Sequence, residues 1–232
     1  MHKSENRGKA NHGWLDTRHS FSFARWYNPD HMGIGPLRVL NQDIIIGGSG
    51  FPSHRHHNMD IVSIVLEGAL EHQDSEGNVA VIRPGEVQRM SAGSGVSHSE
   101  KNHYKDKKTE FLQIWVLPDK ENIAPSYEQI QLKPTVSDRG ELPILASPRG
   151  VSGGVSLHQD AYIYGGNITM GVNTTHVIKK SRLGYFHIPK GSCYVGEMLI
   201  EEGDGLYITG PETLIFTAKT DGYILLFDLI DQ

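Results

Sequence analysis

The 232-residue sequence has almost no cysteine, no excess of positive charge and no long hydrophobic run. Its single cysteine, Cys193, excludes an intrachain disulfide and a cysteine-rich zinc module. The 22 lysines and arginines are outnumbered by 27 aspartates and glutamates, and the net charge of −5 disfavours direct binding to nucleic acid or to an anionic membrane. The N-terminal residues lack the apolar core of a secretory signal, and no segment is apolar enough for a membrane helix. We expect a cytoplasmic protein, and we expect it to be a monomer.

The sequence also lacks the 3.6-residue apolar period of amphipathic helices. Its apolar residues fall instead in short runs rich in β-branched and aromatic side chains, which are typical of β-strands. The clearest runs are Leu37–Leu40, Ile44–Ile46, Ile61–Leu66, Phe111–Leu117 and Tyr223–Phe227. Turn signals separate them, with a hairpin turn expected at Asp74–Asn78 and a short helix near Pro125–Ile130. The pattern predicts an all-β fold, either a sandwich or a barrel.

Prolines divide the chain into two parts. Five of the 11 prolines lie between residues 118 and 148, a stretch that is poorly suited to the interior of a sheet because proline cannot donate to a strand ladder. The halves on either side share a weakly similar order of glycine turns and closing strands, as a duplicated barrel would. We predict one β domain over residues 1–130 and a second over residues 131–232.

Histidine is abundant and unevenly placed, with ten of the 13 histidines before Trp115. His54 and His56 stand two residues apart, and so do His98 and Glu100. In a strand, residues i and i+2 point to the same face. Each pair alone has an ordinary structural interpretation, as polar residues on a solvated strand or as a local hydrogen bond. Together, three imidazoles and one carboxylate suit a divalent transition metal, either iron, manganese, cobalt, nickel, copper or zinc.

These residues resemble the two metal motifs of the cupin barrel and, more closely, the pirin family of two-domain cupins. The resemblance is strong over residues 7–118 and rests beyond residue 150 on Leu157–Asp160 and Leu226–Leu229. The matching segments in the first part are Asn11–Leu15, His19–Phe23, Met32–Gly33, Leu37–Asn41, Gly50–Phe51, His54–Asp60, Leu66–Gly68, His72–Asn78 and Met90–Glu100. The resemblance implies a bicupin of two tandem jelly-roll-like barrels.

The resemblance to pirins implies one metal ion, with iron the first choice, held by His54, His56, His98 and Glu100 in the N-terminal barrel. Asp60 stands where the first cupin motif usually has glutamate, so it is at most a support for the ligands. His57 and Asn58 also depart from the usual family residues, a basic residue and aspartate. In the second half, His176 lacks a partner histidine two residues later, and we predict a metal-free C-terminal barrel.

Some pirins are quercetin 2,3-dioxygenases, which open flavonols with dioxygen and release carbon monoxide. The resemblance thus implies a flavonol and dioxygen as substrates, with Glu100 as the catalytic general base for the 3-hydroxyl group. Other pirins resemble iron-dependent transcription cofactors with the same ligands. The alternative is therefore a non-enzymatic, redox-responsive regulator that acts through a protein partner. A metal-binding bicupin with another natural substrate is a third interpretation.

The remaining candidate residues favour structural roles. His57 should point away from its neighbours on the strand and be exposed. His72 lies next to a hairpin turn, and His12 and His19 lie among aromatic residues, so we expect them to be packed and hydrogen-bonded. Cys193 is expected to be a small buried apolar residue rather than a nucleophile. The sequence contains no nucleophile elbow, P-loop or dinucleotide fingerprint.

Overall fold

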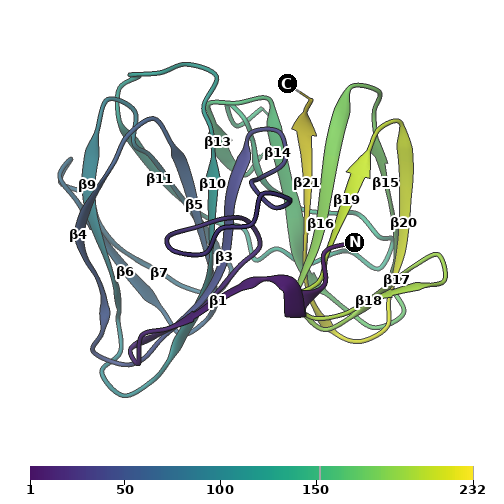
Figure 1. Cartoon of the computed structure of the whole chain (residues 1–232), viewed down its shortest axis with the longest axis horizontal. Coiled ribbons are helices and arrows are strands. Elements are labelled where there is room, and N and C mark those ends of the chain that lie inside the picture. Colours follow the sequence, from purple (N-terminus) through teal and green to yellow (C-terminus); the bar gives the residue numbers. More distant parts are fainter. Residues whose placement is uncertain (152, 232) are drawn as a thin grey trace.

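The computed structural model describes residues 1–151 and 153–231, and almost all of its regular structure is β-strand (Figure 1). The first part contains β1 (Gly8–Asn11), β2 (Leu15–His19), β3 (Leu37–Ile45), β4 (Gly50–His56), β5 (Asp60–Glu67), β6 (Leu70–Asp74), β7 (Val79–Ile82), β8 (Glu86–Ser91), β9 (Val96–Asn102), β10 (Thr109–Val116) and β11 (Ser126–Gln131). The second part contains β12 (Ile144–Pro148), β13 (Val155–Leu157), β14 (Ala161–Ile168), β15 (Asn173–Ile178), β16 (Arg182–Lys190), β17 (Cys193–Val195), β18 (Met198–Ile200), β19 (Gly205–Thr209), β20 (Glu212–Ala218) and β21 (Gly222–Ile230). Within the described ranges the one helical element is a 3-10 turn at Ser4–Asn6, and no helix is long and apolar enough to cross a membrane.

The strands form two barrels that stand side by side (Figure 1). In the first barrel, a seven-stranded sheet in the order β1-β2-β3-β10-β5-β8-β11 is joined by a four-stranded sheet, β4-β9-β6-β7. In the second, a six-stranded sheet in the order β13-β12-β14-β21-β16-β19 is joined by a four-stranded sheet, β15-β20-β17-β18. The predicted all-β fold of two tandem barrels is confirmed. The predicted division after residue 130 stays a prediction.

The prediction of a short helix near Pro125–Ile130 is wrong. The segment is strand β11, which pairs antiparallel with β8. Tyr127 and Gln129, two residues apart, share one face of the strand: the Tyr127 hydroxyl donates to Gln129 Oε1, and the Gln129 amide donates to Val81 O at 3.1 Å. Six residues cannot stabilise a helix by themselves, so pairing with a neighbouring strand decides their conformation. The hairpin turn expected at Asp74–Asn78 is confirmed between β6 and β7.

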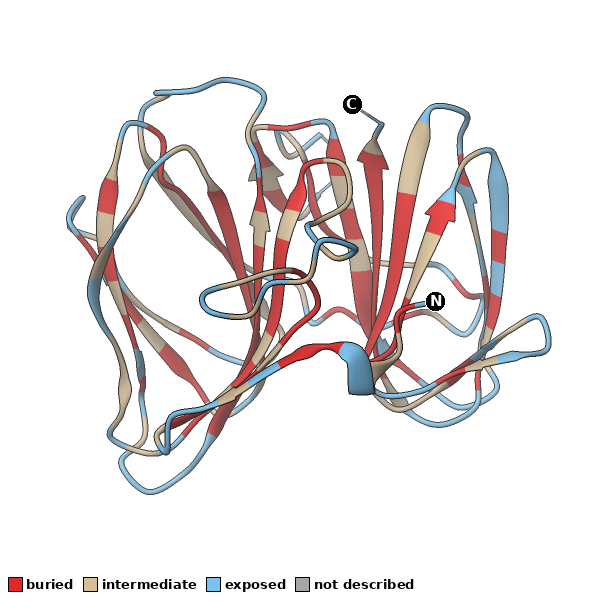
Figure 2. Cartoon of the chain, in the orientation of Figure 1, coloured by how far each residue is buried: buried red, intermediate tan, exposed pale blue. Residues whose placement is uncertain are grey.

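The largest apolar cluster lies between the two barrels and is contributed by both (Figure 2). The larger sheets of the two barrels meet through it, because its members come from β3, β5 and β10 on one side and from β14 and β21 on the other. Representative members are Leu40, Ile64, Leu112, Ile163, Leu225 and Phe227. Smaller clusters fill the interior of each barrel, and the one in the first includes Leu70, Ile82 and Phe111. The two barrels therefore share one buried interface.

Polar contacts also join the barrels. The N-terminal segment reaches the second barrel, where the backbone groups of His2 and Gly205 exchange two hydrogen bonds of 2.7 Å and Lys3 pairs with Asp204 at 2.7 Å. On β5, the carboxylate of Asp60 is fully buried and accepts hydrogen bonds from His158 of the second barrel. These contacts fix the first barrel, and with it the candidate site, relative to the second.

Candidate metal centre

Strands β4 and β9 carry the predicted ligands and lie side by side in the small sheet of the first barrel. The register sets His54 opposite His98 and Gly50 opposite Lys101. Gly50 is required at this position, because a Cβ atom there would lie 2.3 Å from the carbonyl oxygen of Glu100. The absence of a side chain thus lets β4 approach β9 closely enough for the histidines of the two strands to meet.

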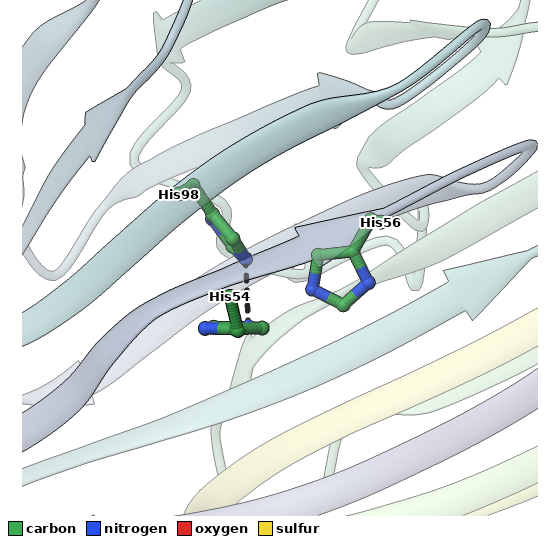
Figure 3. Close-up of side chains that lie close together, drawn as sticks. All are labelled: His54, His56 and His98. Atoms are coloured by element: carbon green, nitrogen blue, oxygen red, sulfur yellow. Dashed lines mark hydrogen bonds between the residues drawn. The ribbon is translucent and has the colours of Figure 1, made fainter.

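Three imidazoles converge in the barrel, as Figure 3 shows. His54 Nε2 and His98 Nε2 lie 3.1 Å apart, and the ring centroid of His56 is 4.8 Å from each of the other two. One nitrogen from each ring lies within 4.8 Å of the other two. His98 is buried and the other two rings are half-buried. The arrangement brings together the three histidines that the sequence singled out.

Burial favours the neutral form of two of these imidazoles. It lowers the pKa of His56 to about 4, with a further contribution from His54. Burial also lowers the pKa of His98 well below its ordinary value, and the neighbouring His56, His54 and His72 lower it further. Neutral imidazole, with a lone pair on one nitrogen, is the form that binds a metal. The electrostatic setting therefore suits a bound cation supplied from outside the chain.

The hydrogen bonds of His54 allow a direct test of that fit. His54 Nδ1 lies 2.8 Å from the carbonyl oxygen of Pro52, and a carbonyl oxygen only accepts, so Nδ1 carries the ring proton. His54 Nε2 then presents a lone pair to His98 Nε2 at 3.1 Å. A cation between the two nitrogens satisfies lone pairs from both rings at once. The residues present thus fit a divalent transition metal.

Glu100 lies deeper and is held by other partners. Its Oε2 accepts a hydrogen bond of 2.6 Å from Gln113, and its Oε1 accepts one of 3.3 Å from Ser63. The pKa of Glu100 is raised to about 7, chiefly by burial and also by nearby Asp43. The hydrogen bonds from Gln113 and Ser63 oppose this increase. Glu100 forms a second potential metal group with His72 and His98. The four predicted ligands are thus divided between two groups that share His98.

Aromatic side chains and a loop surround the imidazoles. Trp115 packs edge-on against His56 with ring centroids 4.9 Å apart, and Phe51 lies 6.3 Å from His54. The loop between β10 and β11 passes close by: Asn122 donates its backbone N–H to Asn58 Oδ1 at 2.7 Å. Asn58 has a φ of +48°, in the left-handed region that asparagine tolerates better than most residues. The wall beside His54 and His56 is therefore largely aromatic.

Several other sequence predictions can be compared with the structure. His57 is exposed as expected, and its Nε2 donates to Asn122 Oδ1 at 3.0 Å. His19 is buried and bonded to Asn41 as expected, but the packed position predicted for His12 is wrong because that side chain is exposed at the tip of the β1–β2 hairpin. Cys193 is buried, and burial raises its pKa to about 12, which disfavours the reactive thiolate.

Three residues have contacts that the sequence reasoning missed. The carboxylate of Asp60 bonds to His158 across the barrel interface. These bonds do not support the three imidazoles. His72 is buried as a structural histidine would be, but its ring faces His98, and Asp74 lies behind it. His72 and Asp74 stand two residues apart on β6, so the same i, i+2 rule used for the ligands could have placed them on one face.

Known proteins match both halves of the chain. The family model described as Pirin matches residues 1–116, and the one described as Quercetinase C-terminal cupin domain matches residues 144–229. The chain is a member of the pirin family. A protein of Escherichia coli strain K12 named quercetin 2,3-dioxygenase is 38% identical over 229 residues, which make up 99% of this chain and 97% of that protein. A pirin-like protein of Caulobacter vibrioides is 37% identical over 224 residues, 95% of each chain.

A solved pirin structure agrees with the fold over the whole chain. The crystal structure of the bacterial pirin YhhW from Escherichia coli in complex with nickel(II) superposes with a TM-score of 0.92 at 37% identity, and the match covers 100% of this chain and 98% of that one. The expected relationship to pirins and the bicupin architecture are thereby confirmed. Membership of this family implies a metal, whose identity in this chain is a separate question.

Proposed function

We propose that this pirin is a metal-dependent dioxygenase that opens flavonols such as quercetin with dioxygen. The observation that carries the proposal is the group of three converging imidazoles from His54, His56 and His98. The names of the similar Escherichia coli proteins support the reaction class, and the nickel(II) complex of YhhW supports a metal. Iron is the first candidate for this chain, and manganese, cobalt, nickel, copper and zinc share the same ligand preferences.

The three imidazoles would hold the metal, and Glu100 is the proposed fourth ligand from the same strand as His98. A bound divalent ion would supply Lewis acidity for the adjacent oxygens of a flavonol. To serve as a ligand, the Glu100 carboxylate would give up its bond to either Gln113 or Ser63 and turn that oxygen toward the histidines. Those two side chains remain as hydrogen-bond partners for whichever carboxylate oxygen faces away from the metal.

Glu100 is also the proposed general base. A flavonol becomes electron-rich enough to react with dioxygen when its 3-hydroxyl group loses a proton, and a buried carboxylate can accept that proton. The aromatic side chains of Trp115 and Phe51 border the imidazoles and offer faces against which a flat aromatic substrate can pack. They also limit the access of water to the site. The chain thus supplies a proton acceptor, three ligands and an apolar wall.

Oxygen uptake tests this proposal. The metal-free protein is reconstituted anaerobically with one metal at a time, and oxygen consumption is then measured with a panel of flavonoids. We expect quercetin-dependent uptake that is lost in His54→Ala protein together with the metal. If no metal form of the protein consumes oxygen with any flavonoid, the proposal is contradicted and a binding role for the site is favoured.

A comparison of two carboxylate variants isolates the role of Glu100. Glu100→Gln keeps the shape of the side chain but removes the basic oxygen, and loss of a general base typically lowers a rate by about 10²–10⁴-fold. Glu71→Gln is the matched control, because Glu71 lies on neighbouring β6, is partly exposed and bonds to His103. We expect the first variant alone to lose turnover when both are compared at equal metal occupancy. Full turnover of Glu100→Gln would refute the role.

A further inference from the structure

Behind the three imidazoles, strand β6 adds a buried histidine and a buried carboxylate. The register sets Asp74 opposite His98 and His72 opposite Glu100. His98 Nδ1 lies 3.4 Å from His72 Nδ1, and His72 Nε2 lies 3.0 Å from Asp74 Oδ2. The side chains of His72 and Asp74 are almost fully buried. A continuous row of polar contacts therefore leads from the metal group into the wall of the barrel.

The number of protons available to this row is smaller than the number of contacts. The row runs from the carbonyl oxygen of Pro52 through His54, His98 and His72 to Asp74, which makes four contacts. Both end groups only accept hydrogen bonds, and each neutral imidazole supplies one proton. Three protons cannot fill four contacts, so one contact is left with two facing lone pairs. That contact is where a cation belongs.

Asp74 limits which contact can stay open. Burial raises its pKa, but hydrogen bonds from His72 and Asn78 outweigh burial and keep the pKa of Asp74 below its ordinary value, so the group is a carboxylate. The carboxylate requires a proton on His72 Nε2, which leaves His72 Nδ1 as an acceptor, so the open contact is one of the two that His98 makes. A proton on His98 Nδ1 fills the contact with His72. His98 Nε2 then presents its lone pair to His54 Nε2. With this tautomer of His98, the open contact falls within the group of three imidazoles.

We propose that His72 and Asp74 are positioning residues that set the tautomer and orientation of His98 for metal binding. The inference rests on the metal site of the proposed function but not on its substrate. The pair is itself held firmly. Asp74 Oδ1 accepts the backbone N–H groups of Glu76 and Asn78, each at 3.0 Å, and the ring of Tyr127 packs against His72 at 5.0 Å.

Asp74→Asn tests the proposal with little change of shape. The oxygen of the amide can keep the bonds to the turn, so its NH₂ group replaces Oδ2 and faces His72 Nε2. His72 Nε2 must then accept, His72 Nδ1 must donate, and the proton of His98 moves to Nε2, where it blocks the lone pair. We expect metal affinity to fall by about 10–100-fold, the usual range for loss of such a support. Nitrogen-15 NMR of the metal-free variant should show His98 protonated at Nε2 instead of Nδ1.

Two further variants separate positioning from a general effect on the turn. Asn78→Ala removes side-chain bonds to Asp74 but leaves the carboxylate facing His72, so it should bind metal like the wild type. His72→Gln supplies one acceptor and one donor and should retain more affinity than His72→Phe, which supplies neither. Equal losses in Asn78→Ala and Asp74→Asn would overturn the proposal. So would an unchanged tautomer and affinity in Asp74→Asn.

A different location for the ion would also overturn it. If the metal sat between His72, His98 and Glu100, His72→Phe would abolish binding and His54→Ala would not. Metal titration and NMR do not depend on turnover. A protein that binds metal as described but consumes no oxygen with flavonoids would therefore contradict the dioxygenase proposal and leave the role of His72 and Asp74 intact.

Discussion

Asp60 provides a test of how the two barrels are held together. Its fully buried carboxylate accepts the backbone N–H of His158 at 2.6 Å through Oδ2 and faces the His158 ring nitrogen Nδ1 at 3.1 Å through Oδ1. Strand β5 of the first barrel is thereby bonded to the segment that follows β13 in the second. Asp60→Asn keeps the size of the side chain but removes its charge, so both contacts with His158 become hydrogen bonds between neutral groups, with the NH₂ group donating to His158 Nδ1.

The cost of this substitution follows from the two bonds. A hydrogen bond to a charged group contributes about 1.5–3 kcal/mol and one between neutral groups about 0.5–1.5 kcal/mol, so each of the two bonds loses about 1–1.5 kcal/mol. We expect the free energy of unfolding to fall by about 2–3 kcal/mol. For a chain of this length each kcal/mol lowers the Tm by about 2–4 °C, so the expected decrease is roughly 4–12 °C.

Thermal unfolding of the metal-free protein gives the Tm, and metal titration of the same preparation gives the affinity. Asp30→Asn, at an exposed carboxylate, is the control and should change neither quantity. We expect Asp60→Asn to lower the Tm and leave the metal stoichiometry unchanged. An unchanged Tm combined with loss of metal would refute this reasoning and make Asp60 part of the metal site.

Three other predictions concern separate parts of the molecule. Gly50→Ala should weaken metal binding at least about tenfold, because a Cβ 2.3 Å from the Glu100 carbonyl oxygen forces β4 away from β9. Such overpacking typically costs about 1–3 kcal/mol. Equal metal affinity of the variant and the wild type in a titration would contradict this prediction. Burial and nearby His31 lower the pKa of His2 to about 4, so its contribution to stability is present above pH 6.5 and is lost as the pH falls toward 4. His2→Phe should flatten the unfolding free energy over that window in denaturant titrations, and an unchanged slope would count against the assignment. Because the largest apolar cluster draws on both barrels, calorimetry should show one unfolding transition, and two resolved transitions would show independent barrels.

Local patterns in the sequence were sufficient for much of the fold and for grouping the three histidines of the candidate site. The run Ile61–Leu66 forms the central part of β5, and all but the last residue of Phe111–Leu117 lie in β10, since β-branched and aromatic residues have the same preference in most sheets. The i, i+2 spacing of His54 and His56 placed both rings on one face of β4, because the period of a strand is fixed by its backbone. The error at Pro125–Ile130 arose where local preference is weak and β8 decides the outcome.

Contacts between distant segments could not be predicted in this way. Nothing in the local pattern around Asp60 indicates a partner 98 residues away, because that contact depends on how the barrels pack. His72 touches His98 only because β6 pairs with β9 in a particular register. The resemblance to pirins supplied a set of four ligands, but the present bonds of Glu100 to Gln113 and Ser63 depend on side-chain packing inside the barrel.

Anomalous X-ray scattering from crystals grown with one equivalent of a transition metal tests the central claim most directly. We predict a single ion bound to nitrogens of His54, His56 and His98, at about 2.1 Å from each. An ion bound elsewhere, or crystals that hold no ion at this group when metal is in excess, would contradict the account.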